Sequence, residues 1–291
     1  MRRTRRSAAA FATSRLPSFR LRPLRQGEIK TSTEFTRILC GVEGNPASTE
    51  AARQAVELST PETSLRFIAI YTSFELGPDH TKEKLQEALE EAVAIAEVAG
   101  ISAETEMQEG RYASKVLLGE AENHDLLVIG THGRSRVAGI LLGSTAGEMT
   151  HGTHHPLLIA REQPSMNGKP QKVLVASDGS DGSWPPARVA GDLGAAGATV
   201  ELIHVDDGKH PGADEVVAEQ AAEIAAAVGG EPELLKEEGH PTEKIVEAAR
   251  ERGASLIVCG RRGLTGIKSL GSVSERVVHQ AGCSVMLIPA H

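Results

Sequence analysis

Aromatic residues are scarce in this chain of 291 residues: phenylalanine, tryptophan and tyrosine together make up 3% of it. Proteins that bind nucleic acid usually present basic stripes, often with aromatic rings on which bases stack. The net charge of this chain is −8. The composition therefore argues against a nucleic-acid surface and favours small-molecule or protein partners.

Cysteines and long apolar runs are also few. The three cysteines, Cys40, Cys259 and Cys283, lie in or beside expected strands and have no paired spacing. This usage fits a reduced, cytoplasmic protein whose thiols act as small core residues. No apolar run approaches the ~20 residues that a membrane-spanning helix needs, so we expect no membrane segment.

Positive charge is concentrated in residues 1–35, which contain nine arginine and lysine residues and only two glutamates. That segment carries +7, which leaves −15 for the rest of the chain. Its composition predicts a disordered basic tail. A transit-like peptide or a twin-arginine export signal is the alternative, but residues 7–12 form too short an apolar region for secretion.

Beyond residue 35, apolar runs typical of strands alternate with helical patterns, which predicts an α/β fold. Strands are expected at 37–43, 65–71, 102–108, 125–129 and 156–160, and again at 172–178, 199–205, 233–237, 255–259 and 285–289. Between residues 81 and 98, Leu85, Leu89, Ala92 and Ala96 recur at helical spacing. This stripe predicts an amphipathic helix packed on a sheet.

The second half of the chain repeats the first. The glycines Gly110 and Gly239 are 129 residues apart, and Gly130 and Gly260 are 130 apart. A tandem duplication predicts two domains, at residues 36–161 and 172–291, with a linker at 162–171. Each domain is expected to be doubly wound, with its ligand at the carboxyl ends of the strands where the winding reverses.

A glycine pattern follows the fourth expected strand of each half. It consists of Gly130, Gly133, Gly143 and Ser144 in the first half, and of Gly260, Gly263, Gly271 and Ser272 in the second. Nine residues separate the middle glycines in the first copy and seven in the second. Open backbone amides followed by a helix N-terminus attract phosphate, and we expect both serines to be helix N-caps. The alternative is that the glycines only permit a tight turn.

Charged side chains lie near these loops. A carboxylate follows the first strand of each half, Glu43 and Asp178, at the expected ligand edge. It suits the hydroxyl or amino groups of a nucleotide, although turn formation explains it equally well. Several cations lie in these loops, and they would suit an anionic ligand. The alternative is that they are ordinary solvated loop charges. They are Arg134, Arg136, Arg261, Arg262 and Lys268.

Three histidines, His151, His154 and His155, precede the last strand of the first half. Such close spacing at a helix end does not converge easily on one metal ion. We expect a solvated, poorly ordered turn and no metal site.

Taken together, these motifs resemble the universal stress protein family in its tandem-domain form. The segments that carry the resemblance are 130–144, 173–180, 202–205 and 260–275. The resemblance implies a five-stranded parallel sheet in each domain, with strand order 3-2-1-4-5, flanked by helices. It also implies pairing through the last strand and, in one subclass of the family, binding of ATP.

In that subclass the glycine pattern holds the phosphates and an aspartate after the first strand meets the adenosine part. The ATP contacts implied by the resemblance are Glu43, Ile70, Gly130, Gly133, Gly143 and Ser144 in the first half, and Asp178, Val205, Gly260, Gly263, Gly271 and Ser272 in the second. Each half departs from the pattern once. The first half has Glu43 in place of the aspartate, and the second has a phosphate loop that is two residues shorter.

We therefore expect an ATP-binding regulatory protein of the stress response, a nucleotide sensor without catalytic residues, with or without Mg²⁺ beside the ATP. Neither a Walker sequence nor a dinucleotide fingerprint is present, which disfavours P-loop enzymes and Rossmann dehydrogenases. Two alternatives stay open. One is a dimeric scaffold in which one or both sites have decayed, and the other is a slow ATP hydrolase that uses Asp178 or Asp181 with Mg²⁺.

The last strand of each half, at 156–160 and 285–289, is expected to be an edge strand. Free edges invite pairing. We predict that these two strands pair with each other inside the chain or across a homodimer.

Overall fold

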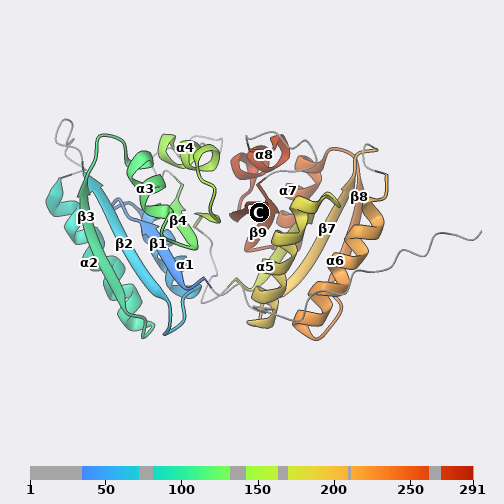
Figure 1. Cartoon of the computed structure of the whole chain (residues 1–291), viewed down its shortest axis with the longest axis horizontal. Helices are drawn as coiled ribbons and strands as arrows, with labels where there is room; N and C mark the ends of the chain where they lie inside the picture. Colours follow the sequence, from blue (N-terminus) through green and yellow to red (C-terminus); the bar gives the residue numbers. More distant parts are fainter. Residues whose placement is uncertain are drawn as a thin grey trace, which may run out of the picture. The chain divides into compact units, whose positions relative to one another are not determined.

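The computed structural model describes residues 35–71, 81–131, 142–162, 170–208, 211–261 and 270–290. The first half contains β1 (Arg37–Gly41), α1 (Pro46–Glu57), β2 (Ser64–Tyr71), α2 (Lys82–Val98), β3 (Ala103–Glu109), α3 (Ala113–Ala121), β4 (Leu126–Gly130), α4 (Ser144–Gly152) and β5 (Leu157–Ala160). The second contains β6 (Lys172–Ser177), the 3-10 turn η1 (Asp181–Ser183), α5 (Trp184–Ala195), β7 (Thr199–Asp206), α6 (Ala213–Val228), β8 (Glu233–Glu238), α7 (Pro241–Arg252), β9 (Leu256–Gly260), α8 (Ser272–Gln280) and β10 (Ser284–Ile288). The expected α/β alternation is confirmed (Figure 1).

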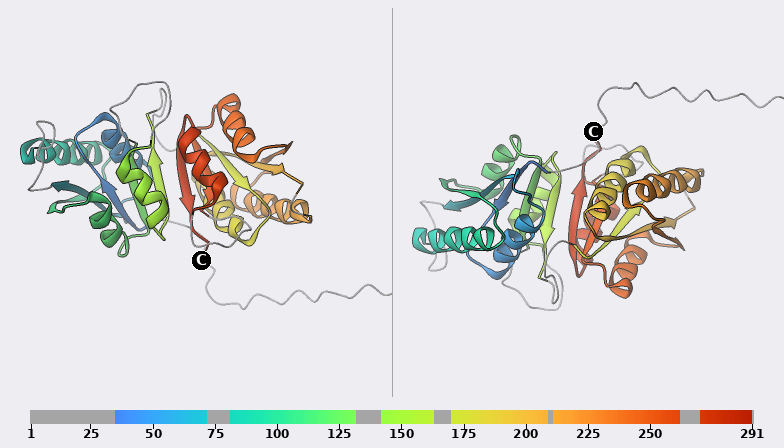
Figure 2. Two further views of the ribbon diagram at one scale, coloured as in Figure 1. Left: turned by 90° about the horizontal axis from the view of Figure 1, so that it is seen from above. Right: turned by 90° about the horizontal axis from the view of Figure 1, so that it is seen from below.

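Strand order confirms the doubly wound fold. The order is β3-β2-β1-β4-β5 in the first half and β8-β7-β6-β9-β10 in the second, which is 3-2-1-4-5 in each. All strand pairs within a half are parallel. The two last strands pair with each other inside the chain, antiparallel, and so join the halves into one ten-stranded sheet (Figure 2). Of the two pairings that the sequence left open, the internal one is observed.

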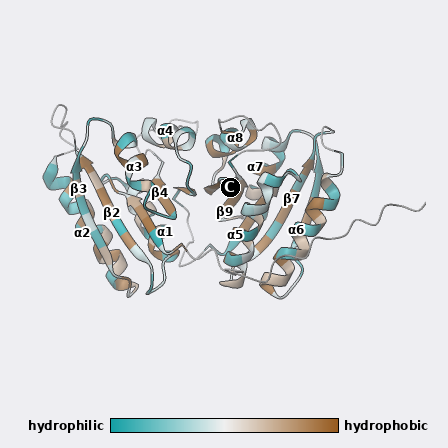
Figure 3. Ribbon diagram, viewed as in Figure 1, coloured by the Kyte–Doolittle hydropathy of each residue, from teal (hydrophilic) through white to brown (hydrophobic). Residues whose placement is uncertain are grey.

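A hydrophobic core covers each face of this sheet. On one face, α1, α2, α5 and α6 bury their apolar stripes against the strands, and the cluster is continuous from Phe67 to Leu202. On the other face, α3, α4, α7 and α8 do the same. Hydrophobic residues are concentrated on the strands and hydrophilic ones on the outward sides of the helices (Figure 3), as expected for strands buried on both faces.

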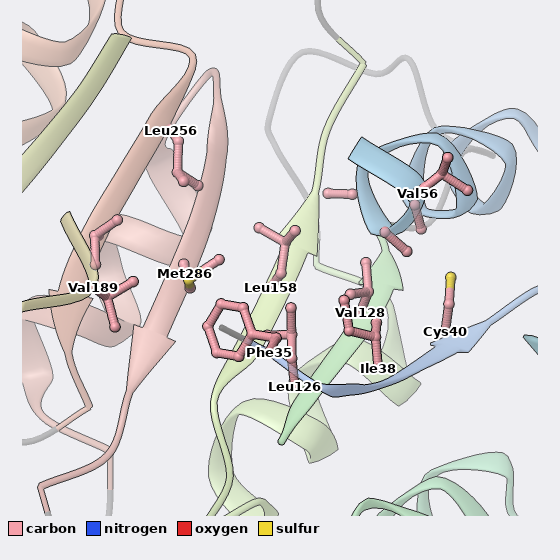
Figure 4. Packing of buried hydrophobic residues seen from close by; sticks show 14 of the residues in the cluster. Phe35, Ile38, Cys40, Val56, Leu126, Val128, Leu158, Val189, Leu256 and Met286 are labelled. Atoms are coloured by element: carbon pink, nitrogen blue, oxygen red, sulfur yellow. The ribbon is translucent and has the colours of Figure 1, made fainter. Parts of the chain in front are cut away.

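The seam between the halves is apolar. Leu158 of β5 is paired in register with Met286 of β10, and their side chains are 1% and 0% exposed. Both lie in the same cluster as Phe35, which precedes β1 (Figure 4). The two halves therefore share a core as well as a sheet.

The strand β1 ends at Gly41, two residues before the predicted end. Val42 still donates a backbone hydrogen bond to Ile68 O at 2.9 Å, but Gly44 then takes φ +70 and turns the chain into α1. Glycine reaches this left-handed conformation without steric cost. Glu43 consequently lies in the loop after the strand instead of in the strand.

All three cysteines are buried and free, as expected for core residues. Burial raises the pKa of the Cys259 thiol to about 12 and that of Cys283 to about 11, so both stay protonated at neutral pH. Of the helices in the described ranges, none combines the length and the apolar character needed to cross a bilayer.

Asp125, just before β4, accepts hydrogen bonds from the residues at the amino-terminal end of β1. Its Oδ2 accepts hydrogen bonds from Thr36 N at 3.2 Å, Thr36 Oγ1 at 2.7 Å and Arg37 N at 3.0 Å, and its Oδ1 pairs with Arg37 Nη2 at 2.7 Å. Partial burial disfavours the carboxylate, but the hydrogen bonds from Arg37 and Thr36 outweigh it and hold the pKa of Asp125 below its usual value. The Asp125 carboxylate therefore stabilises the folded protein at pH values above its usual pKa. This stabilisation is lost as the pH falls through the lowered pKa of the folded state.

We expect Asp125→Asn to lower the free energy of unfolding at pH 7 by about 1 kcal/mol, because the group is partly exposed and screened. The difference from the wild type should shrink as pH falls below 4, near the ordinary aspartate pKa. Urea unfolding at pH 7 and pH 3 measures it, with Glu87→Gln on the exposed face of α2 as control. A difference that grows toward acid pH would contradict this role.

Candidate functional site

A cavity of about 200 Å³ lies at the carboxyl ends of β1, β2 and β4. Its apolar walls include Ile68, Ile70, Leu85, Leu117 and Ile129, and its polar lining includes Glu43, Asn45, Ser48, Thr131 and Thr145. β1 lies between β2 and β4, so the cavity is at the point where the winding of the sheet reverses. Open α/β sheets bind their ligands at this point.

The loop after β1 forms one side of the cavity. Asn45 caps α1: its Oδ1 accepts from Ser48 N at 2.9 Å, while Ser48 Oγ accepts from Asn45 N at 3.2 Å. This reciprocal pair satisfies the amides of Asn45 and Ser48 from within the chain. Asn45 Nδ2 also donates to Glu43 Oε2 at 3.2 Å, which holds the Glu43 carboxylate at the cavity.

Gly130, at the end of β4, lies against the first turn of α1. A Cβ at this position would lie 2.4 Å from Ala47 O and 2.9 Å from Ser48 N. Only glycine permits so close an approach of helix to strand. Part of the reason for a glycine here is therefore packing, and the same approach brings α1 to the rim of the cavity.

The start of α4 forms another side of the cavity, through Thr145 and Ala146. The N-cap is Gly143, and no side chain caps this helix. The expectation that Ser144 and Ser272 are N-caps is wrong, because each is the first residue of its helix and the preceding glycine, Gly143 or Gly271, is the cap. The first amides of α4 consequently have no partner within the helix or from a capping side chain.

The corresponding region of the second half is organised differently. Asp178 Oδ1 accepts from Ser180 N at 3.0 Å and from Ser180 Oγ at 2.6 Å, which is the turn role that the sequence left open. Gly179 takes φ +72, and a Cβ there would lie 2.6 Å from Ala213 Cα at the start of α6. The loop after β6 is thus closely covered by α6, and Val205 is buried.

A buried polar network fills the space beneath that loop. Ser177 Oγ donates to Gln220 Oε1 at 2.6 Å, and Gln220 Nε2 donates to Ser183 Oγ at 2.8 Å. By strand register, Ser177 corresponds to Val42 of the first half, an apolar residue that lines the cavity. The side chains of the second half satisfy one another where those of the first half border a cavity.

Arg261 does not play the part expected of a loop cation. Its side chain is 1% exposed and donates to the backbone oxygens of Thr150 and His151 at the end of α4. The carbonyl groups that end a helix attract cations. Arg261 is therefore bound to the protein itself, and the other four candidate cations lie outside the described residues.

The three histidines have separate partners, and His151 and His154 are exposed, as expected of a solvated turn. His151 Nε2 lies 3.4 Å from Glu275 Oε1, His155 Nε2 lies 3.5 Å from Glu122 Oε2, and His154 contacts Arg261. Within the described ranges, no three histidine, cysteine or acidic residues converge to hold a metal ion.

The structure brings three of the predicted site residues together at the cavity, namely Glu43, Ile70 and Gly130. Gly143 and Ser144 directly precede Thr145, which lines it. In the second half, Gly260 O accepts from Ser274 Oγ at 2.6 Å, and Gly271 N donates to Arg261 O at 2.9 Å. Gly133 and Gly263 lie outside the described residues.

Sequence reasoning missed several lining residues, among them Ser48, Leu117 and Thr145. Thr145 had a usable signal, because it follows Ser144 in the first turn of the same helix. Leu117 had none, because an apolar residue on a helix is usually a core residue.

Comparisons with known proteins agree with this architecture. The model of the universal stress protein family matches residues 34–161 and 169–289. A universal stress protein of Mycolicibacterium smegmatis is 27% identical over 89% of this chain and 99% of its own length. One from Methanocaldococcus jannaschii is 32% identical over 44% of this chain and 83% of its own length.

A solved structure shares the fold. The crystal structure of a universal stress protein from Archaeoglobus fulgidus covers 89% of this chain and 100% of its own, at 24% identity and a TM-score of 0.71. Both matched segments span a complete set of five strands with their helices. The chain therefore belongs to the universal stress protein family.

Proposed function

We propose that this protein binds ATP in the cavity of the first half and acts as a non-enzymatic, nucleotide-responsive regulator in the stress response. The observation that carries the proposal is the cavity itself, which joins an apolar wall, a carboxylate and an uncapped helix N-terminus at the switch point of the sheet. These are three kinds of surface, and they match a base, a sugar and phosphates respectively.

The apolar wall suits the base, since Ile68 and Ile70 of β2 present flat aliphatic surface to the cavity. The Glu43 carboxylate suits the hydroxyl groups of the ribose, because a carboxylate accepts hydrogen bonds and donates none. At about 200 Å³ the cavity is smaller than the ~300 to 1,000 Å³ of typical ligand pockets. It therefore suits the nucleoside part, with the phosphates at its rim.

The phosphates suit the start of α4. Its amides are uncapped, and the positive end of the helix dipole favours an anion there. The start of α1 offers fewer free amides, because Pro46 has none and Ser48 N already donates to Asn45 Oδ1. When Mg²⁺ accompanies the nucleotide, it would supply charge neutralisation of the phosphates.

Isothermal titration with ATP tests the proposal, using Gly143→Val and its second-half counterpart Gly271→Val. Both glycines have a backbone that valine can adopt, with φ −62 and −66, so each variant differs from the wild type mainly by a side chain beside the amides. We expect Gly143→Val to weaken ATP binding by about tenfold or more, or ~1.4 kcal/mol. Gly271→Val should change it by less than about twofold.

Three results would overturn parts of the proposal. Absence of binding heat with the wild type would favour a scaffold whose sites have decayed, and equal losses in both variants would place nucleotide in the second half as well. Steady release of phosphate by the wild type that Gly143→Val abolishes would make the protein a hydrolase.

A further inference from the structure

The side chain of Arg261 crosses from one half of the chain to the other. Arg261 directly follows β9, at the start of the glycine loop of the second half. Its Nε and Nη2 donate to Thr150 O at 3.3 Å each, Nη2 also donates to His151 O, and Nη1 lies 3.4 Å from His154 Nδ1. All of these partners belong to α4 of the first half or to the connection after it.

The backbone of Arg261 is held on the second half. Its amide donates to Ile288 O of β10 at 2.7 Å, and its carbonyl accepts from Gly271 N, before α8, at 2.9 Å. The guanidinium group, itself planar and rigid, is therefore attached to the sheet through a fixed main chain. It acts as a fixed point for whatever it binds.

What it binds is the end of a short helix. α4 has nine residues, well below the ~12 to 15 at which isolated helices become marginal. It has no side-chain cap at its start, and its opposite end is where Arg261 donates. The position of α4 thus depends on packing and on this clamp, and its start, at Thr145, lines the cavity.

We propose that Arg261 is a positioning residue, supplied by the second half, for the phosphate end of the first-half site. The inference rests on the proposed function. Arg261 fixes the last turn of α4 and so sets where the amides of its first turn point, and its positive charge at the carboxyl end adds to the dipole that favours an anion at the other end. The first-half site is therefore incomplete without the second half.

Arg161 provides a matched control. It too is a buried arginine that reaches across the seam, 7% exposed, but in the opposite direction: its Nη2 donates to Val278 O of α8, and its amide donates to Ser284 Oγ at 3.0 Å. Loss of either side chain removes cross-half hydrogen bonds. Only Arg261 touches α4 among the contacts described for the two arginines.

The test compares the dissociation constants of ATP and adenosine in the full-length wild type, Arg261→Gln and Arg161→Gln. Adenosine lacks phosphates, so its affinity depends on contacts with the cavity and not on the start of α4. We expect Arg261→Gln to raise the dissociation constant of ATP by about tenfold, because the amides that contact the phosphates are displaced. The dissociation constant of adenosine should change by less than about twofold. Arg161→Gln should leave the ratio of the two constants unchanged, although the melting temperature falls in both variants.

An unchanged ratio in Arg261→Gln, with a lower melting temperature, would reduce Arg261 to a structural clamp and overturn the inference. If that variant does not fold, Arg261→Lys takes its place. Lysine keeps the positive charge but lacks the planar guanidinium group, and the ratio of the two dissociation constants is compared in the same way. A wild type that binds neither ligand refutes the proposed function itself, which is a different outcome.

Discussion

Gly130→Ala is expected to lower the free energy of unfolding by about 3 kcal/mol, at the upper end of the usual cost of overpacking. The added Cβ would lie 2.4 Å from Ala47 O and 2.5 Å from Ala47 C. Both are backbone atoms of the first turn of α1, so no rotation of a side chain relieves the clash. The helix or the strand has to move.

That movement would also reach the candidate site. The first turn of α1 carries Ser48, whose pairing with Asn45 helps to hold Glu43 at the cavity. We therefore expect weaker ATP binding together with the loss of stability. Both are measured on one preparation, by urea unfolding and by titration.

Gly147→Ala is the matched control. Gly147 lies inside α4, and a Cβ there meets nothing within 4 Å. Alanine should stabilise the helix by up to about 1 kcal/mol relative to glycine. If Gly130→Ala proved as stable as Gly147→Ala, the close approach of α1 to β4 would be refuted.

Leu158→Asp is expected to cost about 3 to 5 kcal/mol, the range seen when a buried charge is left without a partner. Leu158 is 1% exposed and lies opposite Met286 at the seam between the halves. Since a domain is stable by only about 5 to 15 kcal/mol, the variant should unfold at a much lower urea concentration than the wild type. Circular dichroism during urea unfolding measures this.

The control for this change is Val98→Gln. Val98 is 92% exposed at the end of α2, so the free energy of unfolding should stay within about 0.5 kcal/mol of the wild type. A Leu158→Asp variant that unfolds at the same urea concentration as this control would show that β5 and β10 are not joined in a buried seam.

The fold was predictable from the sequence because its signals are local and occur twice. The apolar runs predict individual strands, and the apolar residues at helical spacing from Leu85 to Ala96 predict one helix. The nearly constant offset between the halves indicates the duplication. The pairing of β5 with β10 could be narrowed only to two options, because an edge strand does not specify whether its partner lies in the same chain.

The site was predictable in part. Glu43 follows β1, and Ile70 and Gly130 lie near the carboxyl ends of β2 and β4. These strand ends meet at one edge of the sheet, so topology alone brings the three residues together. The role of Arg261 could not be foreseen, because its partners are backbone oxygens 110 and 111 residues away, and carbonyl groups leave no trace in the residue types. The serines were misassigned by one position, because glycine is also accepted as an N-cap, so residue types alone do not decide between a glycine and the serine after it.

The halves differ in how their polar groups are used. In the second half, Asp178 is engaged by Ser180, and Gln220 by Ser177 and Ser183. In the first half, Val42 stands at the position of Ser177 and borders the cavity. This contrast is why the proposal assigns nucleotide to the first half.

Hydrogen exchange of the full chain with and without ATP shows which half binds the nucleotide. We expect slower exchange on ATP binding for amides in 41–48, 68–71 and 142–147, the segments that border the cavity. We expect no matching change in the corresponding segments 176–183, 203–206 and 270–275. Protection confined to the second set, or no protection in either, would contradict the assignment of ATP to the first half.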